Sequence, residues 1–134
     1  MALVVFDASV LVAFLAREDA HHVAAVEVVR ASLEPGTERC LCAVTLSEIL
    51  VGPIRSGRPG VVEDFVERLS VEVRPVGAAL ALRGATVRAR TGLALPDAYV
   101  VAVGLEARES GSGDVRVESF DQRLLRAYSD LATG

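Results

Sequence analysis

The 134-residue chain contains no lysine and no tryptophan, and aromatic residues make up only 4% of it. All 14 basic residues are therefore arginines, which excludes any mechanism that depends on a lysine amine. With so few aromatic rings, the core has to be built mainly from valine, leucine and alanine. Because 18 acidic residues leave a net charge of −4, a bulk basic surface for gripping nucleic acid is also absent.

Long apolar runs and a disulfide framework are missing as well. No run reaches the roughly 18 uninterrupted apolar residues of a membrane span, and no basic segment precedes the first apolar run, as it would in a signal peptide. The two cysteines, Cys40 and Cys42, stand in a C-x-C pattern that is poor disulfide geometry on one strand. We expect two small buried apolar side chains, a cytoplasmic location and no membrane partner.

The chain alternates between strand and helix patterns, and its length suits a single domain over residues 1–134. We expect strands at about 2–7, 39–44, 70–76 and 114–120, and helices at about 18–36, 45–57, 58–69, 77–92, 95–108 and 121–131. This alternation predicts an α/β fold, with a parallel sheet covered by helices on both faces. Ligands of such folds bind at the carboxyl ends of the strands.

Four acidic residues occur where the predicted strands end or helices begin. Asp7 ends the first strand, inside the apolar stretch "VVFDASVLVAFL", and Glu48 is expected in the first turn of the helix after the second strand. Asp97 opens the helix "LPDAYVVA", and Asp121 follows the last strand. A carboxylate among buried side chains is costly unless it is paired, hydrogen-bonded or bound to a cation.

Each acid also has a purely structural interpretation. The segments Thr45–Glu48 and Ser119–Gln122 fit capping boxes. Asp97 would complement the dipole at a helix start, and Asp7 could cap the turn that follows it. Taken singly, the structural and functional interpretations of these residues stay open.

Taken together, the four acids predict a cation site, because a parallel sheet brings strand ends to one edge. At roughly 5 Å and an effective dielectric constant near 20, each pair of carboxylates repels by about 3 kcal/mol. The cluster would have to take up protons or bind a divalent cation. Oxygen ligands alone favour Mg²⁺ or Mn²⁺ over zinc, and such an ion supports phosphodiester hydrolysis.

Four motifs resemble, in order and spacing, the acidic motifs of the PIN domain over essentially the whole chain: "VVFDASVLVAFL", "TLSEILVG", "LPDAYVVAV" and "SFDQRLL". The length and the first motif are most similar to VapC-type toxins of toxin–antitoxin pairs. The resemblance implies a three-layer α/β/α sandwich with a central parallel sheet. It also implies an Mg²⁺- or Mn²⁺-dependent endoribonuclease that leaves a 5′-phosphate and a 3′-hydroxyl.

Carried over by motif, Asp7, Glu48 and Asp97 would be catalytic metal ligands, and Asp121 would be a fourth acid that varies more across the family. Ser9 and Ser119 would support the site. The strand end "VESFD" departs mildly from the family pattern, since Glu118 adds an acid nearby. The resemblance further implies an RNA substrate, a homodimer with candidate apolar faces between residues 45 and 70, and an antitoxin that brings a basic side chain to the acids.

Two other function classes remain. Aspartyl-phosphate phosphatases and receiver domains also carry an aspartate after the first strand, but they need a lysine that this chain lacks. A non-catalytic PIN-like scaffold that binds RNA or a partner is the main alternative, and the intact set of acids argues against it.

Residues outside the four motifs also have two interpretations each. The histidines of "EDAHHV" could be metal ligands or a general base, or they could simply begin a solvated helix. Several arginines could contact RNA phosphates or pair with acids instead. These residues are His21, His22, Arg17, Arg55, Arg58, Arg123 and Arg126.

Overall fold

The computed structural model describes all residues from 1 to 134. The strands are β1 (Ala2–Phe6), β2 (Thr37–Cys42), β3 (Val71–Arg74) and β4 (Asp114–Glu118). The helices are α1 (Ala8–Leu15), α2 (His22–Ala31), α3 (Ala43–Arg55), α4 (Gly60–Arg68), α5 (Ala78–Thr91), α6 (Leu95–Glu109) and α7 (Gln122–Thr133).

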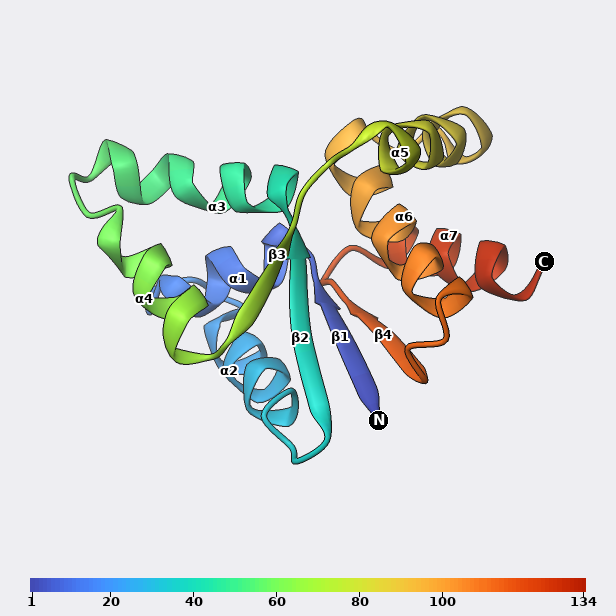
Figure 1. Ribbon diagram of the computed structural model, residues 1–134. Coiled ribbons are helices and arrows are strands. Elements are labelled where there is room, and N and C mark those ends of the chain that lie inside the picture. Colours follow the sequence, from blue (N-terminus) through green and yellow to red (C-terminus); the bar gives the residue numbers. More distant parts are fainter.

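The four strands form one parallel sheet in the order β3-β2-β1-β4. β1 therefore lies inside the sheet, where Val5 pairs with Cys40 of β2 on one side and with Val117 of β4 on the other. Figure 1 shows the strands running side by side with their carboxyl ends at the same edge. The predicted α/β/α sandwich with a central parallel sheet is confirmed.

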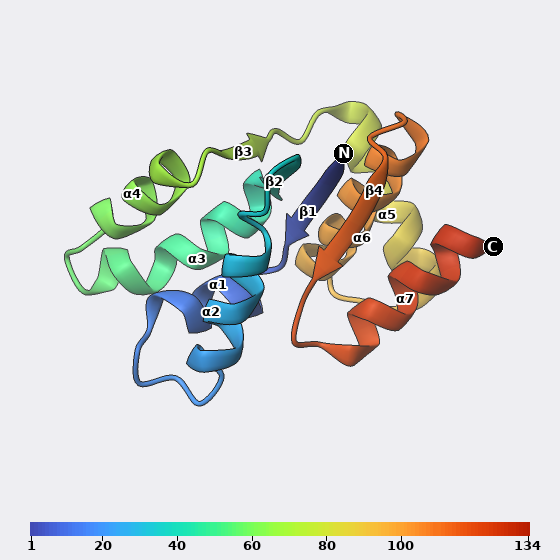
Figure 2. The same cartoon turned by 90° about the horizontal axis from the view of Figure 1, so that it is seen from below.

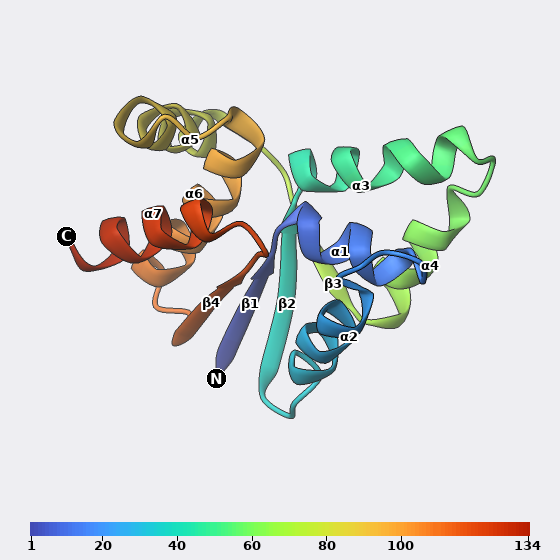
Figure 3. The ribbon, with the colours of Figure 1, turned by 180° about the vertical axis from the view of Figure 1, so that it is seen from behind.

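The helices divide between the two faces of the sheet. Helices α1 to α4 lie on one side and α5 to α7 on the other, as Figures 1 and 3 show from opposite directions. β1 supplies both cores, because alternate side chains of a strand point to opposite faces. Val4 and Phe6 pack with α1 to α4, whereas Leu3 and Val5 pack with α5 to α7.

Small residues let the helices of the second face approach each other and the sheet. A Cβ atom on Gly84 of α5 would lie 2.6 Å from the Tyr99 ring of α6. A Cβ atom on Gly104 of α6 would lie 2.7 Å from the Tyr128 ring and 2.8 Å from Val117. Both tyrosines of the chain are therefore used as packing surfaces over glycines.

One helix and several helix starts differ from the expectations. No helix was predicted directly after the first strand, yet α1 covers Ala8–Leu15. Its sequence "ASVLVAFL" is apolar on nearly every side, so it has no helical period that a pattern could detect. The helix expected from residue 18 begins at His22, and Asp19 accepts a hydrogen bond from the His21 backbone N–H at 2.8 Å instead of capping it.

The capping boxes are also wrong. α3 begins at Ala43 directly after β2, with Cys42 at the N-cap, so Glu48 lies in the second turn of the helix and not the first. The buried hydroxyl of Thr45 has no hydrogen-bond partner. At the start of α7, the N-cap is Asp121 and not Ser119.

Both cysteines are free and buried, as predicted. They point to the same face of β2, into the core under α5 to α7. Burial raises the pKa of the Cys40 thiol to about 12, so this sulfur is unreactive at neutral pH. No helix of the structure combines the length and apolarity needed to cross a membrane.

Candidate active site at the carboxyl edge of the sheet

The candidate site lies where the chain leaves β1 and β4 toward opposite faces. After β1 the chain enters α1, which packs on one face, and after β4 it enters α7, which packs on the other (Figure 2). Neighbouring strands whose connections diverge in this way leave a crevice at their carboxyl ends, which is where α/β folds bind ligands. Asp7 stands at this point, one residue beyond β1.

Asp7 is held by two serines that come from opposite ends of the chain. Its side chain is 3% exposed. The hydroxyls of Ser9 and Ser119 both donate to Asp7 Oδ2, each at 2.7 Å. The Asp7 backbone N–H donates to the Glu118 carbonyl at 3.0 Å, which extends the pairing of β1 with β4. The capping interpretation of Asp7 is therefore wrong, because its side chain makes no cap hydrogen bond.

The serines are themselves fixed by backbone donors. Ser9 Oγ accepts from the Phe120 N–H, and Ser119 Oγ accepts from the Asp121 N–H, both at 3.0 Å. Each hydroxyl has one proton and donates it to Asp7. The two Oγ atoms, which are 3.4 Å apart, therefore do not form a hydrogen bond with each other. Asp7 Oδ1 accepts no hydrogen bond from the protein, and this oxygen is the one available to a cation.

Glu48 reaches the same region from α3. Although the residue as a whole is exposed, partial burial of its carboxyl raises the pKa, and the negative charges of Asp7 and Asp97 raise it further. Three acids that are far apart in the sequence thus act on one another at this edge of the sheet. That these acids converge on one cation stays a prediction.

Asp97 stands in the first turn of α6, behind Pro96. Burial raises its pKa, and the charges of Asp7 and Asp121 add to the shift. The guanidinium of Arg123 opposes it, so this arginine of α7 lies within electrostatic reach of the acids. Arg123 also donates from Nη2 to the Thr91 carbonyl at 3.4 Å, which ties α7 to the end of α5.

Asp121 also has a structural role, as the N-cap of α7. Its Oδ1 accepts from the backbone N–H groups of Arg123 and Leu124, at 2.9 and 3.4 Å, and so caps α7. Its charge still acts on Asp97. Glu118, the additional acid in this motif, does not join the group: burial raises the pKa of its carboxyl and Arg116 lowers it, with no contribution from the four acids.

The acids are suitable ligands for a divalent cation, but they do not form a preorganised metal site. No three His, Cys, Asp or Glu side chains stand close enough together to hold a metal ion as they are. The donors are all carboxylate oxygens. Burial is the main cause of the raised pKa values of Glu48 and Asp97, and the neighbouring acids add a repulsion that a divalent cation would relieve. Asp7 is fixed by its two serines, whereas Glu48 is exposed and Asp97 is half-buried.

A groove of about 550 Å³ begins at Glu48 and runs between α1 and α3 toward the start of α4. Its floor is apolar, with Val12, Leu15 and Val61, and the charged side chains of Glu18 and Arg58 stand in it. Of the arginines considered from the sequence, Arg58 is the one that lines this groove. Sequence reasoning missed the groove, because its walls come from separate helices.

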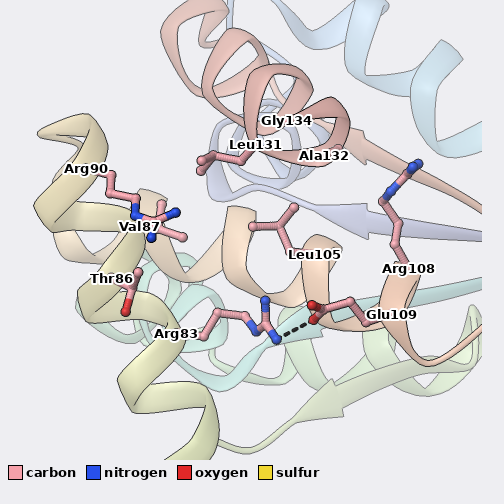
Figure 4. A pocket seen from close by; sticks show the side chains of 10 residues that line it. All are labelled: Arg83, Thr86, Val87, Arg90, Leu105, Arg108, Glu109, Leu131, Ala132 and Gly134. Atoms are coloured by element: carbon pink, nitrogen blue, oxygen red, sulfur yellow. Dashed lines mark ion pairs between the residues drawn. The ribbon is translucent and has the colours of Figure 1, made fainter.

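A second concavity, of about 310 Å³, lies between α5, α6 and the end of α7 (Figure 4). Three arginines surround an apolar floor that includes Leu105, and Arg83 forms an ion pair with Glu109. None of the four acids lines this concavity.

The histidines do not join the acids. His22 Nδ1 lies 2.9 Å from the Ala13 carbonyl, which ties the start of α2 to α1. His21 is exposed and lies against Phe120. A metal-binding role for either residue has no support here, since neither belongs to a group of potential ligands.

Comparison with known proteins decides the family. The family model of the PIN domain matches residues 4–130. The chain belongs to the PIN domain family. The resemblance drawn from the four acidic motifs is thereby confirmed. No curated protein sequence matches the chain significantly.

Two solved structures resemble the chain over most of its length. The toxin VapC20 of Mycobacterium tuberculosis, which cleaves the sarcin–ricin loop, is 25% identical with a TM-score of 0.70, over 92% of this chain and 94% of VapC20. A toxin–antitoxin complex from Klebsiella pneumoniae is 18% identical with a TM-score of 0.61, over 88% of this chain and 86% of the other, and shows the shared fold. The likeness to VapC20 supports a PIN domain of the VapC type.

Proposed function

We propose that this PIN domain is a metal-dependent endoribonuclease and the toxin of a toxin–antitoxin pair. The observation that carries the proposal is the environment of Asp7. A nearly inaccessible carboxylate is held through one oxygen by two serines. Its charge acts on both Glu48 and Asp97, and Asp121 acts in turn on Asp97. The likeness to VapC20, a toxin described as cleaving RNA, supports the reaction class.

The residues proposed to hold Mg²⁺ or Mn²⁺ are Asp7, Glu48, Asp97 and Asp121. When bound, such an ion supplies an activated water and charge stabilisation for phosphodiester hydrolysis. Ser9 and Ser119 hold the Asp7 carboxylate in one orientation, so that its free oxygen faces the crevice. Fixing a ligand in this way lowers the cost of reorganisation during the reaction.

Arg123 is the basic side chain best situated to contact the substrate. Its charge already acts on Asp97, so a phosphate beside the acids would lie within its reach. In a chain with a net charge of −4, a local arginine offsets part of the repulsion between the acids and RNA. Arg126 is exposed on the next turn of α7 and is the second candidate.

The apolar groove between α1 and α3 supports an antitoxin partner. A segment with apolar side chains would cover Val12 and Leu15, and a basic residue at its end would meet Glu48 at the mouth of the groove. Such a cation would take the place of part of the metal's charge and inhibit the enzyme. We expect Val12→Asp to weaken antitoxin binding in a titration followed by calorimetry.

A homodimer is also part of the proposal. Val51 and Ile54 of α3 are 46% and 59% exposed, and they lie in the region between residues 45 and 70 where an apolar interface was expected. Light scattering behind size-exclusion chromatography would report the mass in solution. A monomer at every concentration tested would contradict the dimer and leave the nuclease proposal untouched.

The test of the nuclease is cleavage of total cellular RNA by the purified protein without its antitoxin. We expect discrete fragments that require Mn²⁺, disappear with EDTA and are absent with Asp7→Asn, which we expect to keep the fold. Asp64→Asn, an exposed acid on α4, is the matched control and should cleave normally. No cleavage by folded wild-type protein would favour the non-catalytic scaffold that binds RNA or a partner.

A further inference from the structure

Two rings that are distant in the sequence lie against each other beside the candidate site. His21 stands just before α2, and Phe120 lies in the loop between β4 and α7. The ring centroids are 5.3 Å apart, and the ring planes are inclined by 35°. Figure 2 shows the start of α2 and the loop before α7 at the same edge of the molecule.

The Phe120 backbone belongs to the hydrogen-bond network of Asp7. Its N–H donates to Ser9 Oγ at 3.0 Å, and Ser9 donates to Asp7 Oδ2 at 2.7 Å. Phe120 also sits between Ser119, the other donor to Asp7, and the acid Asp121. The Phe120 backbone is therefore connected to the buried Asp7 carboxylate through two hydrogen bonds.

The pair differs from the other aromatic residues of the chain. The remaining rings either contact one another in the core under α1 to α4 or cover the glycines of α5 and α6, and they are Phe6, Phe14, Phe65, Tyr99 and Tyr128. The chain has few aromatic side chains, so the packing role of the other rings does not account for one accessible pair next to the acids.

Stability alone does not explain His21. The residue is exposed, and its ring makes no hydrogen bond. Its backbone is held independently, because its N–H donates to Asp19 Oδ1 at 2.8 Å. Phe120 is only partly buried and packs against the apolar core at its edge. The result is an imidazole that is supported by a phenyl ring on one side and reached by solvent on the other.

We infer that His21 and Phe120 form a stacking platform for an unpaired RNA base next to the cleaved phosphodiester. This inference rests on the proposed nuclease function of the same site. Because the Phe120 backbone is linked to Asp7 through Ser9, a base adjoining a phosphate bound near Asp7 would lie close to the ring pair. Bases of single-stranded RNA stack on Phe and His side chains, whereas the faces of paired bases are already covered.

The charge of the protein makes such a contact useful. Proteins that bind RNA usually gain affinity from phosphates that meet a basic surface, but this chain has a net charge of −4 and an acidic site. Stacking does not depend on charge, and it tolerates different bases because every base has a flat face. The platform therefore predicts a preference for unpaired RNA without a strict choice of base at that position.

The experiment uses fluorescence of a five-nucleotide single-stranded RNA with 2-aminopurine at its centre, because stacking quenches this base. The protein carries Asp7→Asn, so that the probe is not cleaved. We expect binding to quench the probe. His21→Ala should weaken binding about tenfold and abolish the quenching, while His21→Phe should restore both. Val23→Ala, a 76% exposed position of α2, is the control and should bind as the parent does.

Phe120→Leu keeps the apolar volume and protects the fold, and it should reduce the quenching as His21→Ala does. The platform is wrong if the parent does not quench the probe, or if His21→Ala and Phe120→Leu bind and quench as the parent does. Loss of antitoxin binding with unchanged RNA binding would likewise reject it and assign the pair to the protein interface.

Cleavage assays separate this inference from the nuclease proposal. In the wild-type background, His21→Ala should raise KM for a short single-stranded RNA while kcat changes little, since stacking contributes to binding throughout the reaction. Cleavage without any quenching would reject the platform and keep the nuclease. Quenching without any cleavage would reject the nuclease and leave the ring pair as a stacking site of a protein that only binds RNA.

Discussion

Removing the Ser119 hydroxyl tests the account of Asp7 most directly. Ser119→Ala deletes one of the two donors to Asp7 Oδ2 and also the acceptor of the Asp121 N–H. The lost bond is charge-assisted and buried, at 2.7 Å, and bonds of this kind contribute about 1.5–3 kcal/mol. The Asp121 N–H lies near the surface, so water replaces much of its bond. We expect a loss of about 2 kcal/mol in the free energy of unfolding.

For a chain of this length, about 2 kcal/mol corresponds to a fall in Tm of roughly 8 °C. Ser9→Ala should cost a similar amount, because Ser9 makes the equivalent pair of bonds, to Asp7 and from Phe120. The double variant should lose more than the sum of the single variants, because it leaves a nearly inaccessible carboxylate with no donor at all. Cleavage should fall about tenfold or more with either single variant, since the carboxylate then loses its fixed orientation.

Thermal unfolding followed by circular dichroism, in EDTA, measures the stability effect without any bound metal. Ser129→Ala is the matched control, because that serine is exposed on α7 and its hydroxyl makes no hydrogen bond. A Tm for Ser119→Ala within about 1 °C of the wild type would refute the reasoning. So would a double variant whose loss equals the sum of the two single losses.

Three further predictions concern charge, metal and packing. The raised pKa values of Glu48 and Asp97 mean that the folded state binds their protons more tightly than the unfolded state does, so these groups favour folding less as pH rises. In EDTA, Glu48→Gln should therefore raise Tm at about pH 7, and the gain should vanish near pH 4; a gain that grows toward low pH would contradict this. Mn²⁺ at a hundred times its Kd should stabilise the wild type by about 2.7 kcal/mol, measured as a Tm shift that Asp97→Asn largely removes; equal shifts in both proteins would exclude Asp97 as a ligand. Gly104→Ala should destabilise by about 2 kcal/mol in urea unfolding, because its Cβ would meet Val117 at 2.8 Å. Gly52→Ala, in the last turn of α3 where a Cβ atom would meet no other atom within 4 Å, should change stability by less than about 1 kcal/mol, and the opposite order of these two glycine variants would refute the packing argument.

The order of strands and helices could be predicted because it depends on local patterns. Residues 62, 65 and 69 repeat at helical spacing, and the buried strands read as continuous apolar runs. The four acids could be recognised as candidate site residues because they also stand out locally in the sequence. A charge inside an apolar run, as at Asp7, or one behind a helix-starting proline, as at Asp97, departs from its surroundings in a way that the sequence alone displays.

The capping interpretations were wrong because they also used only a few neighbouring residues of the sequence. The motif T-x-x-E at Thr45 looks like a helix start, but where a helix begins after a strand depends on where the strand's pairing ends. β2 pairs with β3 as far as Cys42, and the backbone turns into α3 at the next residue. α1 was missed for the opposite reason, since its residues are apolar on nearly every side of the helix and leave no polar face that would have shown a period.

The sequence by itself determined the α/β class and singled out the four candidate acids and the two candidate serines that accompany them. Only the tertiary structure decided that Ser9 and Ser119 share one oxygen of Asp7, although Ser119 is 112 residues away from it. The same is true of the stack between His21 and Phe120. Both contacts exist because β4 pairs with β1 and not with β3, and strand order is set by the packing of whole helices, which no local pattern encodes.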